Sequence, residues 1–368
     1  MKKPKLLIVG AFPRSDRRIY GGGILKSCSI ILKSKISKEF EVITINSSQI
    51  SNPPPNFFIR SILAFKRIIN LFFKLISYRP DASLIFSSDG ASALEKGLMI
   101  LICNSFKSKT LIFPRAGRLI HQVENSKLMF KIIRSLYSKS SIFLCQGKKW
   151  EKFALNILKI EKKKVKILNN WTATDELIKI GELRNYDKNY SYKLLFVGWI
   201  EETKGVFDLI QIIKNLKMKS IDFTLTLVGG GNAEKSLKNY IKKNDLNNVK
   251  LLGWLNSDQL INIYKNHNIF VFPSWYEGMP NALIEAMASG LAVISSSAGV
   301  ISDNLNNGEN ALLSPPRENN IFQKNLEKII SDDKLLKRIA INGHKLSKLK
   351  FSSTKGMDDL RCIINDLI

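Results

Sequence analysis

The fold is decided by the stretch IFVFPSWYEGMPNALIEAMASGLAVISSS, residues 269–297. An apolar run at each end flanks a polar loop and a helical segment at 280–289. Pro280 can occupy the first helical turn, where its missing N–H costs nothing, and Gly290 suits the position just after the helix. The stretch therefore predicts a strand–loop–helix–strand unit of a parallel sheet.

The same alternation continues in both directions along the chain. Strands are expected at 5–12, 40–46, 82–88, 110–115, 141–146, 165–170, 193–200, 223–231, 249–254, 269–274 and 291–297. Further helices are expected at 205–219, 233–244, 257–266 and 319–349. A chain of 368 residues suits two domains, each with its own core.

These patterns predict an α/β protein of two Rossmann-like doubly wound domains facing a central cleft. We expect a first domain at 1–180, a second at 181–350 and a C-terminal helix at 351–368. Whether that helix returns to the first domain is left open by the sequence.

The loop before the helical segment at 280–289 lies at the carboxyl edge of the predicted sheet, where open α/β folds bind ligands. The helix N-terminus offers free N–H groups and a positive dipole end to a phosphate. Glu277 and Glu285 are poor phosphate ligands but good acceptors for sugar and ribose hydroxyls. This combination favours a nucleotide sugar as the ligand.

The spacing from Glu277 to Glu285, set in EGMPNALIEAMASGLAVISS, resembles the signature of family 4 glycosyltransferases with the GT-B fold. These are retaining enzymes of the kind found in bacterial polysaccharide assembly. The resemblance implies that Glu277 contacts the donor sugar and Glu285 the ribose. It also implies that the backbone around the sugar and pyrophosphate is that of Gly278, Met279, Pro280 and Asn281.

The segment LLFVGWIEETKGVFDLI, residues 194–210, resembles the opening strand and loop of the family's nucleotide domain. The family normally has Gly-Arg followed by Lys-Gly; here Gly198 is followed by Trp199, and Lys204 keeps the lysine. Either Lys204 acts alone on the donor phosphates or another basic side chain substitutes. Gly229, in LVGGGNAEKSL, resembles the family's loop near the nucleotide.

In the first half, glycines at 21–23 follow the first strand and precede a helix. Such glycines let backbone N–H groups approach a phosphate, or they form a plain flexible turn. The resemblance implies that Gly22 and Gly23 contact the donor phosphate. It also implies that Arg115, in LIFPRAGRL, stands close to the place where many relatives carry a histidine beside the reacting sugar.

The net charge of +26 is divided unevenly. Residues 1–180 hold 33 Lys or Arg and 11 Asp or Glu, whereas residues 181–368 hold 24 and 20. The first half should therefore attract an anionic membrane surface or a lipid-linked phosphate. A helix at 57–77 has a wide apolar face and a basic stripe, which fits a membrane-interface helix or a packed helix with one solvated basic face.

The resemblance implies a hexose-transferring glycosyltransferase. We expect it to be metal-independent and without a cofactor, because no metal-ligand spacing or DxD pair occurs. Its co-substrate would be a UDP or GDP sugar and its acceptor a saccharide, free or lipid-linked. The charge is not interleaved with an aromatic platform, so nucleic acid is not expected as a partner. Scattered cysteines favour a reducing compartment and no transmembrane run occurs, so we expect a cytoplasmic protein. From the charge of the first half we expect it to be peripheral on the inner membrane face. The alternative is a non-catalytic scaffold or binding protein, suggested by Trp199.

Overall fold

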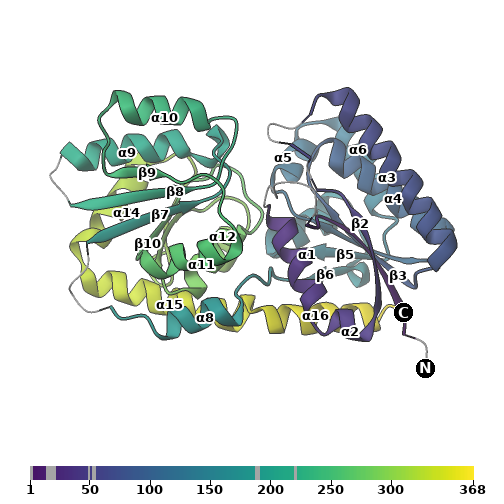
Figure 1. Ribbon diagram of the computed structural model, residues 1–368. Helices are drawn as coiled ribbons and strands as arrows, with labels where there is room; N and C mark the ends of the chain where they lie inside the picture. Colours follow the sequence, from purple (N-terminus) through teal and green to yellow (C-terminus); the bar gives the residue numbers. More distant parts are fainter. Residues whose placement is uncertain (1–2, 14–21, 49, 52–54, 187–190, 219–221) are drawn as a thin grey trace. The chain divides into compact units, whose positions relative to one another are not determined.

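The computed structural model describes residues 3–13, 22–48, 50–51, 55–186, 191–218 and 222–368. The chain forms two compact units, Met1–Trp171 with Ser353–Ile368, and Thr172–Ser352. Each unit holds a six-stranded parallel sheet among the described residues, with helices packed around it (Figure 1). The predicted class, two Rossmann-like α/β folds, is confirmed.

The first sheet has the strand order β2-β1-β3-β4-β5-β6. Its strands are β1 (Lys5–Gly10), β2 (Glu41–Asn46), β3 (Ala82–Ser87), β4 (Lys109–Pro114), β5 (Ile142–Cys145) and β6 (Val165–Ile167). The helices of this unit are α1 (Gly23–Lys33), α2 (Ile36–Glu39), α3 (Phe57–Tyr78), α4 (Ala91–Ser105), α5 (Arg118–Glu124), α6 (Lys127–Tyr137), α7 (Lys148–Lys152) and α16 (Ser353–Asn365).

The second sheet has the strand order β12-β11-β10-β7-β8-β9. Its strands are β7 (Tyr192–Val197), β8 (Phe223–Val228), β9 (Val249–Leu251), β10 (Ile269–Phe272), β11 (Ala292–Ser296) and β12 (Leu312–Ser314). Its helices are α8 (Asp175–Glu182), α9 (Val206–Met218), α10 (Glu234–Lys243), α11 (Ser257–Asn266), α12 (Asn281–Ala288), α13 (Ile301–Asn304), α14 (Asn319–Ser331) and α15 (Asp333–Phe351).

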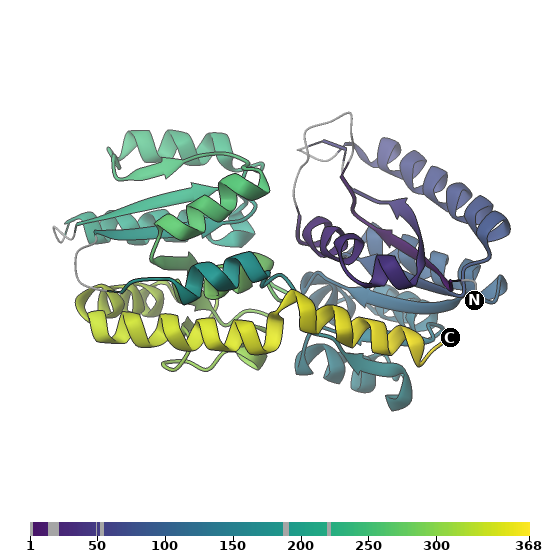
Figure 2. The same cartoon turned by 60° about the horizontal axis from the view of Figure 1, so that its bottom comes forward.

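The units divide between Trp171 and Thr172, earlier than the expected boundary at 180. Helix α8 belongs to the second unit because it packs on α12 and α15. Helix α16 belongs to the first unit (Figure 2). Its residues Met357, Leu360 and Ile364 are buried in the same core as Trp171.

Two details of the predicted second domain are wrong. The expected helix at 319–349 is two helices, because Asp332 interrupts the pattern and its side chain accepts a hydrogen bond from the Leu335 N–H at 2.9 Å. This makes Asp332 the N-cap of α15. The short edge strand β12 was not expected, since three residues give too little periodicity to detect.

Helix α3 runs along the outer edge of the first unit (Figures 1 and 2). Its inward side holds the buried Leu71 and Leu75, together with Lys74, whose ammonium donates to the Thr44 carbonyl at 2.6 Å. The outward side carries most of its large apolar residues, including Phe65 and Phe73, which are more than 60% exposed. The packed helix with a solvated basic face, one of the two interpretations of this segment, is therefore wrong.

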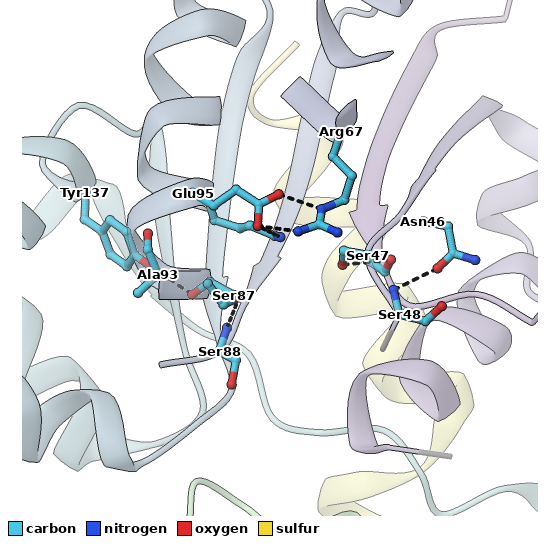
Figure 3. A network of polar contacts seen from close by, with 12 residues as sticks. Asn46, Ser47, Ser48, Arg67, Ser87, Ser88, Ala93, Glu95 and Tyr137 are labelled. Atoms are coloured by element: carbon cyan, nitrogen blue, oxygen red, sulfur yellow. Dashed lines mark hydrogen bonds and ion pairs between the residues drawn. The ribbon is translucent and has the colours of Figure 1, made fainter. Parts of the chain in front are cut away.

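An ion-pair cluster fixes the rotation of α3 on α4 (Figure 3). Arg67 of α3 donates through Nε and Nη2 to the two carboxylate oxygens of Glu95, at 2.7 and 2.9 Å. Lys96, almost fully buried, lies 3.0 Å from the same carboxylate. Burial alone would raise the pKa of Glu95, but the hydrogen bond from Arg67 and the charges of Lys96 and Arg67 bring it below its usual value. Glu95 therefore neutralises two cations in a partly dry site.

We predict that Glu95→Gln lowers the free energy of unfolding by about 3–5 kcal/mol at neutral pH, since it leaves two cations without a buried counter-charge. Urea denaturation measures the change. Because the folded-state pKa of Glu95 is lowered, its contribution is present above the unfolded value of 4.5 and is lost as the pH falls through the folded value.

The difference between wild type and Glu95→Gln should therefore shrink below pH 4.5. Glu161→Gln removes a carboxylate from an exposed pair with Lys163 and serves as the control. It should leave the urea midpoint unchanged. A Glu95→Gln variant as stable as wild type at neutral pH would contradict the role given to the cluster.

Candidate active site

The candidate site is built on the end of β10 and the loop that follows it. Strands β10 and β11 are paired in parallel and both are buried. The hydroxyl of Ser295 donates to the Phe272 carbonyl at 3.1 Å, and that of Ser296 donates to the Ser274 carbonyl. These two serines, which the sequence analysis did not single out, tie the start of the loop to β11. The sequence feature that could have identified them is a pair of polar residues at the carboxyl end of an apolar strand.

Glu277 and Lys204 are brought together by this loop. The ammonium of Lys204 lies 2.5 Å from Glu277 Oε1, although 73 residues separate the two in sequence. The Trp275 N–H donates to the Thr203 carbonyl at 2.9 Å, which joins the two segments. Gly205 has a positive φ, and a Cβ there would lie 2.3 Å from the Pro273 carbonyl oxygen. Glycine after Lys204 is therefore required for the segments to meet.

A second glycine, Gly299, packs against the backbone of Glu277. Gly299, in the turn after β11, has φ +62°, and an added Cβ would lie 1.7 Å from the Glu277 carbonyl oxygen. The neighbouring Val300 N–H donates to the Gly278 carbonyl at 3.4 Å. The sequence analysis missed Gly299, because its partner is distant in sequence and a lone glycine indicates only a turn.

Helix α12 begins at Asn281, one residue later than expected, so Pro280 precedes the first helical turn instead of lying in it. Pro280 is its N-cap residue, Asn281 its first residue, and Gly290 follows its C-cap with φ +74°. Met279 is buried, and the Asn304 amide lies 3.8 Å from its sulfur. The loop and the helix N-terminus thus stand together at the carboxyl edge of the sheet.

Glu285 lies on α12 and is 4% exposed. Tyr264 of α11 donates its hydroxyl hydrogen bond to Glu285 Oε2 at 3.1 Å. Burial and the adjacent Glu285 charge raise the pKa of Tyr264 well above its usual value, so the phenol stays protonated as a donor. Tyr264 was not expected from the sequence, where it is one more residue on an amphipathic helix.

The loops after β7, β8 and β9 also converge. A Cβ on Gly229, which has φ +128°, would lie 1.9 Å from the Gly198 carbonyl oxygen. The Gly229 N–H donates to the Gly253 carbonyl at 2.8 Å. Trp199 packs edge-to-face on Trp254 with ring centroids 4.8 Å apart. Trp199, which stands where the family resemblance implies an arginine, therefore packs on Trp254.

In the first unit, Arg115 follows β4 and packs its guanidinium 4.8 Å above the Phe113 ring and 5.5 Å from the Trp171 ring. Its Nη2 donates to the Ser27 hydroxyl at 3.2 Å. Burial lowers the pKa of Arg115, but a guanidinium stays protonated at neutral pH.

Helix α1 starts at Gly23, with Gly22 as its N-cap residue. Residues 14–21, which include Gly21 of the predicted loop, lie outside the described residues. Nothing in the described first unit tests the roles assigned to Gly22, Gly23 and Arg115, which stay predictions.

In the parts of the chain that the structure describes, no group of three His, Cys, Asp or Glu side chains is arranged to hold a metal ion. Among the same residues, no helix is both long and apolar enough to cross a bilayer.

Comparison with known proteins finds similar glycosyltransferases. Residues 183–346 match the model of the family described as "Glycosyl transferases group 1". An uncharacterized glycosyltransferase of Methanocaldococcus jannaschii is 27% identical over 361 residues, 95% of each chain. The capsular polysaccharide biosynthesis glycosyltransferase CapM of Staphylococcus aureus is 29% identical over 60% of this chain and 53% of its own.

A third relative is the UDP-Gal:alpha-D-GlcNAc-diphosphoundecaprenol alpha-1,3-galactosyltransferase of Escherichia coli. It is 25% identical over 66% of this chain and 65% of its own. Among solved structures, sucrose-phosphate synthase from Thermosynechococcus elongatus has a TM-score of 0.79, with 16% identity and 99% of each chain covered. Anabaena HepE, solved with UDP and glucose, has a TM-score of 0.72 and 15% identity, with 99% of this chain and 100% of its own covered.

The chain therefore has the fold of these solved structures, the GT-B fold with its two Rossmann-like domains. More narrowly, residues 183–346 resemble the group 1 glycosyl transferases, and the chain is similar to an enzyme of capsular polysaccharide biosynthesis.

We predict that Gly299→Ala destabilises the protein more than Gly308→Ala. Gly308 also has a positive φ, +78°, but a Cβ there meets nothing within 4 Å, so its replacement costs only the left-handed strain. That strain is about 1–2 kcal/mol. At Gly299 the same strain is joined by a clash with the Glu277 backbone. Urea denaturation of the two variants checks this; equal losses would mean that the Glu277 loop yields freely.

Proposed function

We propose that the chain transfers a hexose-type sugar from a nucleotide-diphosphate sugar, of UDP or GDP type, to a hydroxyl of a saccharide acceptor, with retention of configuration. The observation that carries the proposal is the Lys204–Glu277 pair beside the N-terminus of α12. It places the Lys204 cation, from the loop after β7, against the Glu277 carboxylate in the loop that leads into α12. A diphosphate and a sugar need these groups together.

The groups would divide the donor between them. An ammonium has three donor hydrogens, so Lys204 can bind phosphate oxygens while keeping its contact with Glu277. Glu277 would accept hydrogen bonds from the sugar hydroxyls. Glu285, held by Tyr264, would accept from the ribose, and the backbone from Gly278 to Asn281 would line the sugar and pyrophosphate.

The leaving diphosphate gains negative charge as the glycosidic bond breaks. Fixed dipoles at the N-terminus of α12 and the Lys204 ammonium can stabilise that charge, and we propose that they do so without a metal ion. The acceptor hydroxyl would attack from the face that the diphosphate leaves and pass its proton to the departing phosphate. This same-face course follows from the family resemblance.

For the acceptor we propose a saccharide linked to a lipid phosphate, in surface polysaccharide assembly. The name of the Escherichia coli relative describes a diphosphoundecaprenol-linked acceptor. The charge of residues 1–180, with 33 basic and 11 acidic side chains, suits an anionic membrane. We therefore place the protein in the cytoplasm, peripheral on the inner membrane face.

Nucleotide binding tests the donor site first. We expect one of UDP, GDP, ADP and CMP to raise the melting temperature equally with and without magnesium. At 100 times its dissociation constant, the ligand should add about 2.7 kcal/mol of stability. Glu285→Ala should weaken this shift, because the ribose loses its acceptor.

No shift with any nucleotide would overturn the donor site and favour the non-catalytic scaffold, with Trp199 the first suspect. A shift that requires magnesium would contradict metal independence. Glu309→Ala, which changes an exposed carboxylate of the second unit, serves as the control and should keep the full shift.

Transfer itself is tested with UDP-hexoses and GDP-hexoses on a synthetic polyprenyl-diphosphate-linked N-acetylhexosamine. We expect a product whose anomeric configuration, read by NMR, equals that of the donor. Glu277→Gln should lower kcat/KM by about 100-fold or more, the effect of removing one transition-state contact.

Glu202→Gln, an exposed carboxylate two residues from Lys204, should leave kcat/KM within about twofold. An inverted product would rule out the same-face course. A fully active Glu277→Gln variant would remove Glu277 from the site.

A further inference from the structure

The outward side of α3 is a continuous apolar surface. Its most exposed members are Phe57 at 77%, Phe58 at 72%, Phe65 at 64% and Phe73 at 62%. The same side includes Ile59, Ile62, Ile69, Phe72 and Ile76, each at least 39% exposed. We call these nine side chains the α3 face. Soluble proteins seldom leave such a patch uncovered, and one of this kind marks a surface that binds something.

The α3 face points outward because polar contacts hold the other side inward. Arg67 is bound by both oxygens of Glu95, and Lys74 donates to the Thr44 carbonyl. Turning the helix to bury the phenylalanines would break these contacts and expose Leu71 and Leu75. The exposure of the α3 face is therefore built into the packing of α3.

The α3 face continues onto the neighbouring helix. Phe72 packs edge-to-face on Phe106, just beyond the end of α4, with ring centroids 5.4 Å apart. Leu98 follows Glu95 by one turn on α4 and is 46% exposed. Residues one turn apart share a side of a helix, so Leu98 is an exposed apolar residue on the side of α4 that carries Glu95.

The charges around the α3 face are all of one sign within its own segment. Residues 55–80 contain five Lys or Arg and no Asp or Glu. Arg60, Lys66 and Arg79 are exposed, and Lys107 is exposed beside Phe106. The surface thus combines hydrocarbon at its centre with basic groups at its margin.

The apolar centre and basic margin of the α3 face indicate what binds there. A second copy of the chain would bring the same cations against one another, which costs free energy at an interface. A bilayer with anionic headgroups offers hydrocarbon to the phenylalanines and phosphate to the lysines and arginines. With 22 residues, α3 is about 33 Å long and would lie flat in the interface.

We propose that the α3 face inserts into the interface of an anionic lipid bilayer and is the docking surface of the protein. This deepens, and rests on, the peripheral location proposed above by naming the element that makes it. The phenylalanines enter the acyl boundary, and Arg60, Lys66 and Arg79 contact the headgroups.

Vesicle sedimentation of the full chain tests the proposal. The probes are vesicles of phosphatidylcholine alone and of equal parts phosphatidylcholine and phosphatidylglycerol. We expect strong binding to the mixed vesicles and at least tenfold weaker binding to phosphatidylcholine alone. Phe65→Gln with Phe73→Gln should weaken binding to the mixed vesicles at least tenfold.

The matched control is Leu183→Gln with Leu349→Gln, which changes two apolar residues of the second unit that are 74% and 75% exposed. It should bind the mixed vesicles within twofold of wild type. Circular dichroism melts should show that both double variants fold, because all four positions face solvent.

Three outcomes would overturn the proposal: wild type staying in the supernatant with mixed vesicles, the phenylalanine variant binding like wild type, or the leucine variant losing binding equally. If wild type is a dimer in sedimentation equilibrium, the phenylalanine variant is a monomer and neither binds vesicles, the α3 face would instead be the interface with a second copy.

The nucleotide-induced melting shift, measured on the same variants without vesicles, separates this inference from the proposed function. Docking with no nucleotide shift would contradict the donor site alone. A normal shift with no docking would contradict the α3 face and the peripheral location, and would leave the donor site standing.

Discussion

In the second unit, the loops at the carboxyl edge of the sheet approach one another so closely that backbone meets backbone. At Gly205, Gly229 and Gly299, an added Cβ would fall within 2.3 Å of a carbonyl oxygen from another loop. Parallel strands end at the same edge of a sheet, so the loops that follow them are crowded together there. Glycine has no Cβ, so the loops can pack this closely, and the close contact brings Lys204 to Glu277.

The first unit depends on a different balance, between polar contacts inside and apolar side chains outside. Burying Arg67 and Lys96 is unfavourable unless their charge is compensated, and Glu95 supplies the compensation. Once this cluster forms, the rotation of α3 is fixed. The exposed phenylalanines are the consequence of that rotation.

Much of this arrangement could be predicted from the sequence. The strand β10, the helix α12 and the glycine at 290 follow from local chemistry, since each depends on residues close in the chain. The sequence predicted that Lys204 and Glu277 belong to one site, but not that they contact each other. Gly299 and Tyr264 were not foreseen, because their contacts with Glu277 and Glu285 join residues that no local pattern connects.

By itself, the sequence determined two parallel α/β folds, the loop that carries Glu277 and the excess of positive charge in the first half. Periodicity, capping and composition are local quantities, and each can be counted along the chain. Only the tertiary structure decided which side of α3 faces water, because a helical wheel gives two opposite sides and no direction. The direction came from Glu95 and the Thr44 carbonyl, which lie on other elements and bind the polar side of the helix.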